Sequence, residues 1–146
     1  MNRWNNYFIG VAKLTADLSH CVRLKVGAVA VRDRRIISCG YNGMPAGADN
    51  CCEDNNYFDV NTQEYITVTK EEVSHAEENL ITFSARNGIS LLGASLYITH
   101  APCIHCAKLA RNAGFKEVIY SQLYRDDSGL KYLEKYEVRT LQWKPS

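Results

Sequence analysis

Two cysteines lie three positions apart in the stretch THAPCIHCAKLAR, residues 99–111, immediately after a proline. Pro102 suits the entrance of a helix, and a helix start favours thiolates because its N–H groups and dipole stabilise negative charge. Cys103 and Cys106 could therefore form a disulfide, a redox couple, a structural zinc knuckle or half of a catalytic metal site. Because zinc takes four ligands in a tetrahedral arrangement, the choice depends on which other residues complete the site.

His75 is the best candidate for a third ligand among the four histidines of the chain. It opens a predicted helix and precedes Glu77 by two residues, so the imidazole can bind a metal while the carboxylate reaches a metal-bound water. His105 lies between the two cysteines, where its side chain should diverge from the sulfurs. His100 could contact the metal ligands without binding the metal itself, and His20 is interpreted as an ordinary histidine at a helix end.

The order His-Ala-Glu followed by Pro-Cys-x-x-Cys is the signature of zinc deaminases that act on nucleobases. It predicts that zinc held by His75, Cys103 and Cys106 lowers the pKa of a water, and that the resulting hydroxide attacks C4, the carbon that carries the exocyclic amine. Glu77 is the predicted proton shuttle to the ring nitrogen and the departing ammonia. The alternative is a structural zinc knuckle with Glu77 as a bystander, but such sites usually have a fourth Cys or His.

Hydrophobic periodicity predicts helices and strands in alternation. Helices are predicted over residues 4–20, 75–88, 103–113 and 128–135, and strands over 26–31, 35–40, 94–99, 116–120 and 136–142. Strands that alternate with helices imply a layered α/β sheet with helices packed on its faces. Residues 41–72 lack periodicity and contain Gly, Pro, Asn and Asp, so we predict a long irregular segment with a functional role.

Length and composition predict one globular domain spanning residues 1–146. The formal net charge of +1 gives no support for nucleic-acid binding. No apolar segment is long enough for a membrane helix, and the N-terminus lacks the apolar region of a signal peptide. We therefore expect a cytoplasmic protein without nucleic-acid or membrane partners, and a reducing cytoplasm disfavours disulfides between the six cysteines.

Four segments share their pattern with one enzyme family, and these are HCVRLKVGAVAV, IISCGYNGMPAG, HAEENLITFSARNG and APCIHCAKLARNAG. Over most of its length the chain resembles the deoxycytidylate (dCMP) deaminases, the phage-type members in particular. The resemblance implies a three-layer cytidine-deaminase-like fold, a mixed five-stranded sheet flanked by helices, assembled as a homohexamer in the cytoplasm (the host cytoplasm if the protein is viral). It implies conversion of dCMP to dUMP and ammonia, which feeds thymidylate synthesis, with activation by dCTP and inhibition by dTTP.

Matching this chain to the family motif, residue by residue, implies the members of the active site. His75, Cys103 and Cys106 correspond to the zinc ligands, and Glu77 corresponds to the proton shuttle. Four further positions are implied in substrate binding, and these are Asn42, Ala76, Arg86 and Tyr124. Asn42 would hydrogen-bond the nucleotide and Tyr124 would contact the sugar and phosphate. The alternatives are a tyrosine that only packs and, for Arg86, a helix-end cation favoured by the dipole.

The resemblance also implies an effector site, at which Mg²⁺ would accompany a triphosphate. Its candidate residues are Lys25, Gly43, Gly47 and Phe83, and for Phe83 the alternative is packing in the core. Independently of the family, the turns of YNGMPAG, residues 41–47, expose backbone N–H groups that could cradle phosphate oxygens.

A second, structural zinc occurs in phage relatives, and two of its cysteine ligands correspond to Cys21 and Cys51. The histidine and acidic ligands expected shortly before His75 are missing from this sequence, although Cys52 and His20 could complete a site with the two cysteines. One catalytic zinc without the structural one is therefore the favoured interpretation.

Two other kinds of function stay open from the sequence. The same chemistry could act on dCTP, on free cytidine or deoxycytidine, or on adenosine in tRNA, although the near-neutral charge disfavours RNA. A protein of another class, a non-catalytic subunit that binds zinc or nucleotides, would bind zinc without turning over any substrate.

Overall fold

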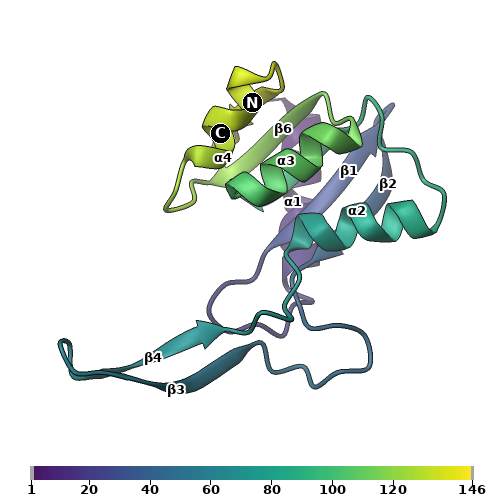
Figure 1. Ribbon diagram of the computed structural model, residues 1–146. Helices are drawn as coiled ribbons and strands as arrows, with labels where there is room; N and C mark the ends of the chain where they lie inside the picture. The colour runs from purple at the N-terminus through teal and green to yellow at the C-terminus, as the bar shows by residue number, and fades with distance from the viewer. Residues whose placement is uncertain (1, 146) are drawn as a thin grey trace.

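The computed structural model describes residues 2–145, except for the side chains of residues 55–57, and in that range the chain forms four helices and seven strands (Figure 1). In chain order they are α1 (Arg3–Ala16), β1 (Gly27–Arg32), β2 (Arg35–Tyr41), β3 (Glu53–Asp59), β4 (Glu64–Thr69), α2 (Ala76–Arg86), β5 (Ser95–His100), α3 (Ile104–Ala113), β6 (Glu117–Gln122), α4 (Ser128–Lys135) and β7 (Arg139–Gln142). The predicted alternation of helices and strands is confirmed.

Five strands form one mixed sheet in the order β2-β1-β5-β6-β7. β1 is antiparallel to both β2 and β5, whereas β5, β6 and β7 run parallel to one another. The parallel register places Ile98 beside Tyr120, and the antiparallel register places Ala28 beside Ile98. This is the mixed five-stranded sheet flanked by helices that the family resemblance implies.

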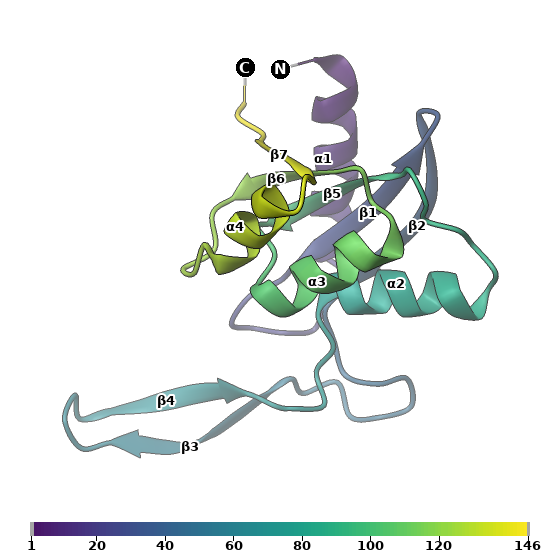
Figure 2. The ribbon, with the colours of Figure 1, turned by 45° about the horizontal axis from the view of Figure 1, so that its top comes forward.

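Alternating residues of the central strands fill two separate cores. Ala28, Leu96 and Val118 belong to the core under α2, α3 and α4. Their neighbours Val29 and Tyr97 belong to the core on the opposite face, which α1 covers with Phe8, Ile9 and Ala12. Figure 2 shows α1 on one side of the sheet and α2 and α3 on the other, so the molecule has three layers.

One edge of the sheet collects the ends of four strands. β5 and β6 both finish there because they are parallel, and β1 begins there because it is antiparallel to β5. β2 also finishes at this edge, where Tyr41 pairs with Gly27. The loops that follow these strand ends therefore meet at one place, which is where ligands bind in many α/β sheets.

Residues 41–72 differ from the prediction of an irregular segment, because they contain the hairpin β3–β4. Its two strands pair only with each other, in a two-stranded sheet that points away from the body (Figure 1). The hairpin was not predicted because its strand EDNNYFD is mostly polar and lacks a continuous apolar face. At its base, the Lys70 N–H donates to the Cys52 carbonyl oxygen.

Two predicted bounds are also corrected. α1 ends at Ala16 rather than at residue 20, since the Asp17 N–H caps the carbonyls of the last turn and Leu18 stays exposed. The last strand is shorter than predicted, beginning at Arg139 after the buried Val138. Among residues 2–145, no helix is long and apolar enough to cross a membrane.

Candidate active site and metal centre

The start of α2 presents His75 and Glu77 toward the edge of the sheet. His75 is the N-cap residue of α2, with extended backbone, and Glu77 is buried in the first turn. The neighbouring Glu78 turns away from Glu77, since its carboxylate accepts the backbone N–H of His75 at 2.8 Å and lies 3.6 Å from Nε2 of His105. Glu78 therefore fixes the backbone that carries His75.

The start of α3 presents the two cysteines in the same way. Cys103 is the N-cap residue, and its sulfur accepts a hydrogen bond from the backbone N–H of Cys106 at 3.5 Å. Cys103 is partly exposed and Cys106 is buried. The two sulfurs thus lie on one side of the first helical turn, as the Cys-x-x-Cys spacing predicts.

The structure brings His75, Cys103 and Cys106 together. Nδ1 of His75 lies 3.2 Å from the Cys106 sulfur and 3.7 Å from the Cys103 sulfur, and the three ligand atoms lie within 4.8 Å of one another. One imidazole nitrogen and two sulfurs are ligands that zinc prefers, and three protein ligands leave a tetrahedral position free. The donor set therefore fits a catalytic zinc ion.

The protonation of these ligands is coupled. A hydrogen bond from the Cys106 thiol lowers the pKa of Cys103 to about 3, and that same bond, together with burial, raises the pKa of Cys106 above its usual range. The hydrogen bond with Cys103, aided by nearby acidic charge, raises the pKa of His75 to about 9. A metal ion must displace the protons of His75 and Cys106, so its binding is favoured by rising pH.

Glu77 combines burial with proximity to the ligands. Its side chain is 4% exposed, and burial raises its pKa to about 7, although interactions with His75 and Cys106 oppose this shift. A carboxyl group with a pKa near neutrality can both accept and donate a proton during one reaction cycle. The predicted proton shuttle therefore has the environment that this role requires.

A cavity of about 570 Å³ opens in front of His75 and Glu77. It is lined by loops at the sheet edge and by the starts of α2 and α3. Three of the four predicted substrate-binding residues line it, and these are Asn42, Ala76 and Tyr124. The cavity is large enough for a nucleotide-sized ligand.

Arg86 is the predicted substrate-binding residue that does not line the cavity. It ends α2, ten residues after Ala76 begins it, which corresponds to about 15 Å along the helix. Its guanidinium lies over the exposed ring of Phe83 instead, 5.8 Å from the ring centroid. Contact between Arg86 and a substrate bound in the same chain is therefore not supported, and Phe83 is not a core residue.

Asn42 already uses half of its side-chain amide within the protein. Its Oδ1 accepts the backbone N–H of Val26 at 2.9 Å, and its Nδ2 donates to the Leu24 carbonyl at 2.8 Å. An amide has two donor hydrogens and two acceptor lone pairs, so one of each stays available for a ligand. Asn42 both shapes the loop before β1 and faces the cavity.

His100 and Gln122 are cavity residues that the motifs did not identify as substrate contacts. They end β5 and β6 and are paired in register. Thr99 Oγ1 lies 2.9 Å from Nδ1 of His100, and burial lowers the pKa of His100, which keeps the ring neutral. Their positions at strand ends could have identified them from the sequence, because the ends of parallel strands lie at the same edge of a sheet, here beside the helix that follows Cys103.

Three of the four predicted effector residues, Lys25, Gly43 and Gly47, lie in loops beside this cavity, whereas Phe83 lies on α2. Gly43 pairs with Ser74 through two backbone hydrogen bonds, which ties the loop after β2 to the residue before His75. Lys25 is exposed between two residues of the cavity wall, and Gly47 has φ of 87°, in the left-handed region. Their effector role stays a prediction.

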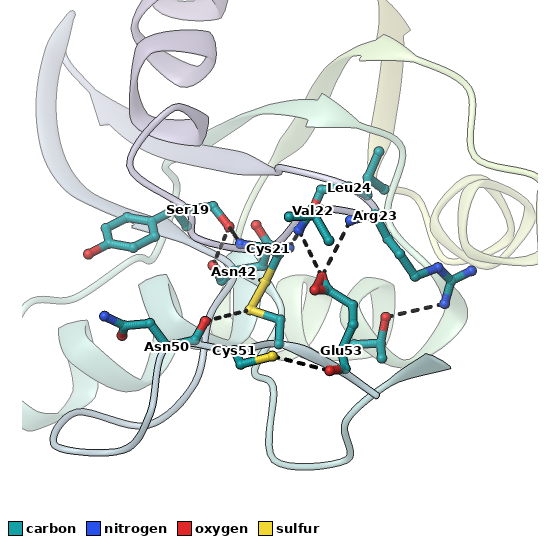
Figure 3. The surroundings of a disulfide bond; sticks show 12 residues. Ser19, Cys21, Val22, Arg23, Leu24, Asn42, Asn50, Cys51 and Glu53 are labelled. Atoms are coloured by element: carbon teal, nitrogen blue, oxygen red, sulfur yellow. Dashed lines mark hydrogen bonds between the residues drawn. A yellow bond between two sulfur atoms is a disulfide. The ribbon is translucent and has the colours of Figure 1, made fainter. Parts of the chain in front are cut away.

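A second cysteine cluster differs from the predicted pair Cys21 and Cys51. Cys21 is joined to Cys52 by a disulfide, contrary to the expectation that disulfides are disfavoured (Figure 3). Cys51 is exposed and its sulfur contacts the Glu53 carbonyl oxygen. Consecutive residues of an extended chain point to opposite sides, which is why only one of the two cysteines can face Cys21. The potential ligand atoms of Cys21, Cys52 and Glu53 lie within 4.8 Å of one another.

Comparison with known proteins agrees with the donor set described above, because it matches the chain to a family of zinc-binding deaminases. Residues 2–122 match the family model described as the cytidine and deoxycytidylate deaminase zinc-binding region. Deoxycytidylate deaminase of Mycobacterium phage D29 is 40% identical over 121 residues, which cover 80% of this chain and 93% of the phage protein. ComE operon protein 2 of Bacillus subtilis is 40% identical over 122 residues, and the match covers 84% of this chain but 61% of that protein.

A solved structure extends the similarity to almost the whole chain. The dCMP deaminase of cyanophage S-TIM5, crystallised in complex with dCMP and dUMP, is 32% identical and gives a TM-score of 0.84. The match covers 98% of this chain and 99% of the cyanophage chain. The predicted cytidine-deaminase-like fold is thereby confirmed.

Proposed function

Because the chain belongs to the cytidine and deoxycytidylate deaminase family, we propose that it hydrolyses dCMP to dUMP and ammonia. The observation that carries this proposal is the buried Glu77 beside the set His75, Cys103 and Cys106, at the base of a nucleotide-sized cavity. The cyanophage enzyme, which has the same fold, was crystallised with dCMP and dUMP.

The family is zinc-binding, and the donor set described above fits this metal. Zinc held by His75, Cys103 and Cys106 would supply a water whose pKa is lowered toward neutrality, and this water is the nucleophile that the reaction needs. Glu77 takes one proton from the attacking water and transfers it to the ring nitrogen, and then moves the second proton of that water to the amine, which leaves C4 as ammonia. The overall change consumes one water and releases one ammonia.

Several residues would hold the base in place for this reaction. Asn42 retains one N–H donor and one lone pair for the nucleotide, as its other two groups fix Leu24 and Val26. Tyr124 packs partly against the main core, so its ring has a defined position on the cavity wall. Ala76 is fully buried, lies between His75 and Glu77 in the chain, and lines the cavity with a small side chain.

The experiment that tests this function compares Glu77→Gln with Glu78→Gln. Loss of cytosine absorbance and release of ammonia from dCMP should fall by about 10²- to 10⁴-fold in Glu77→Gln, while the zinc content stays that of the wild type. Glu78→Gln should keep near-normal activity, because glutamine can still accept the backbone N–H of His75. Full activity of Glu77→Gln would refute the mechanism.

A panel of dCMP, dCTP, deoxycytidine and a tRNA substrate separates this activity from related ones. Zinc binding without turnover on any of them would identify the non-catalytic alternative. Assembly as a homohexamer, regulation by dCTP and dTTP, Mg²⁺ with a triphosphate effector, a second zinc and a cytoplasmic location stay predictions. The exposed pair Phe83 and Arg86 on α2 is consistent with a role at a subunit contact.

A further inference from the structure

Two guanidinium groups border the cavity without a role in the proton chemistry. Arg23 comes from the loop between α1 and β1, and Arg125 comes from the loop between β6 and α4. Among the described residues that line the cavity, these are the only Lys or Arg side chains. Both are exposed, so an anion entering the cavity can reach them.

The base of the hairpin holds Arg23 in place. The Glu53 carboxylate accepts the backbone N–H groups of Val22 at 2.8 Å and Arg23 at 3.3 Å (Figure 3). Nη1 of Arg23 donates to the Thr69 hydroxyl at 3.3 Å. Glu53 begins β3 and Thr69 ends β4, so both contacts come from the end of the hairpin that adjoins the body.

This arrangement prepares Arg23 for a ligand. Its backbone and one guanidinium nitrogen are already fixed, which reduces the conformational entropy lost on binding. The guanidinium has five N–H donors, so its single contact with Thr69 leaves donors for a bidentate contact with phosphate. The buried charge of Glu53 is compensated by the two N–H groups that it accepts.

Arg125 is placed by the residue before it. Its guanidinium lies 5.7 Å from the centroid of the Tyr124 ring, and Tyr124 packs partly against the main core. Arg86 does not line the cavity, so it does not supply this cation within one chain. A phosphate monoester carries about two negative charges at neutral pH, which two guanidinium groups can balance.

We propose that Arg23 and Arg125 together bind the 5′-phosphate and thereby select nucleotides over nucleosides, and that Glu53 and Thr69 act as positioning residues for Arg23. This inference rests on the proposed function, because it assigns the phosphate of the same substrate.

Steady-state kinetics on dCMP and deoxycytidine test this selection. In Arg23→Ala and Arg125→Ala, kcat/KM for dCMP should fall by about 10- to 100-fold, the usual effect of losing a hydrogen bond to a charged group. The value for deoxycytidine should stay within about twofold of the wild type, because no phosphate is present. Arg35→Ala is the matched control, since Arg35 is exposed at the start of β2 and does not line the cavity.

The positioning role has its own readout. Thr69→Val removes the hydroxyl that accepts from Arg23 but keeps the size of the side chain. It should raise KM for dCMP by about two- to tenfold without changing kcat, since a neutral acceptor is worth less than the charged contact itself. Arg23→Lys should recover part of the loss of Arg23→Ala, because lysine keeps the charge without the fork geometry.

Binding of dUMP and deoxyuridine, measured by calorimetry, separates failure of this inference from failure of the proposed function. If the wild type does not turn over dCMP, the proposed function fails, but a tighter affinity for dUMP that disappears in the two arginine variants would still support the phosphate site. An equal loss for dCMP and deoxycytidine would show a merely structural role. Unchanged selectivity in both variants, or its loss only in Arg86→Ala, would overturn the proposal.

Discussion

Gly129 packs directly against the backbone that presents a metal ligand, so its replacement by alanine should disturb the site without removing any ligand. It is buried in the first turn of α4. A Cβ atom at this position would lie 2.8 Å from the carbonyl carbon and oxygen of Cys103, and closer still to the carbonyl oxygen of Pro102. Real Cβ contacts essentially never fall below 3.0 Å, so either α4 or the segment before α3 has to move.

The size of the effect follows from what the new methyl group meets. Overpacking costs about 1–3 kcal/mol, and the upper value is expected because the obstacle is backbone rather than a flexible side chain. At about 2–4 °C per kcal/mol for a chain of this size, 3 kcal/mol lowers Tm by about 6–12 °C. Since the same movement displaces Cys103, zinc affinity should fall by about 10- to 100-fold, as when the support of a ligand is removed.

Thermal melting and competition for zinc with a chelator measure both effects. Gly10→Ala in α1 is the matched control, because its new Cβ would meet no atom within 4 Å apart from the neighbouring backbone of its own helix. Alanine is favoured over glycine in a helix by about 1 kcal/mol, so this variant should melt about 2–4 °C higher with unchanged zinc affinity. If Gly129→Ala has the Tm and the zinc affinity of the wild type, the close packing of α4 on Cys103 is refuted.

Two further changes test the surroundings of the site. Cys52→Ala, or reduction of the wild type, should lower the free energy of unfolding by about 3–4 kcal/mol. The reason is that the disulfide to Cys21 spans a sequence separation of 31 residues. Identical melting with and without reductant would contradict this. Burial lowers the pKa of His100, so the unfolded chain takes up a proton that the native chain does not, and stability should fall as the pH drops through the ordinary value of 6.5. His100→Gln should flatten that part of the urea-derived stability profile between pH 7 and pH 5, and an unchanged slope would count against the assignment.

The metal centre was predictable because each half of it is a short local motif. His75 and Glu77 lie within one helical turn, and so do Cys103 and Cys106, so the spacing alone fixes which side chains share a face. The strand between the two helices is buried and has apolar residues at its centre, so a strand could be predicted there as well. Only the contact between the start of α2 and the start of α3 could not be predicted from local spacing, because it depends on the tertiary fold.

The second cysteine cluster was harder to predict because it depends on which side of an extended segment faces the body. Cys51 and Cys52 are adjacent; the family resemblance matched Cys51, with Cys21, to ligands of a second zinc, whereas Cys52 is the residue bonded to Cys21 in the structure. The hairpin between Glu53 and Thr69 was missed for a related reason: its strands pair with each other and bury little, so hydrophobic periodicity is weak there.

Arg86 shows a different limit of sequence reasoning. The family resemblance implied a role of Arg86 in substrate binding. Within one chain, however, Arg86 ends α2, and only the start of α2 lines the cavity. The two arginines that do reach the cavity follow no catalytic motif. They were brought there by the return of separate loops to one sheet edge, which spacing along the chain does not encode.

The chemistry and the choice of substrate therefore depend on different parts of the molecule. Proton transfer and metal binding reside at two helix starts that are packed against the sheet, and Glu77 and Cys106 are both buried. The residues proposed to bind phosphate lie on exposed loops, and Arg23 is held by a hairpin that is attached to the body only at its base. Because substitutions in the hairpin leave the helix starts in place, they should change KM and nucleotide preference while kcat and zinc content stay nearly constant. Substitutions around Gly129 should instead change kcat and zinc content, while KM and nucleotide preference stay nearly constant.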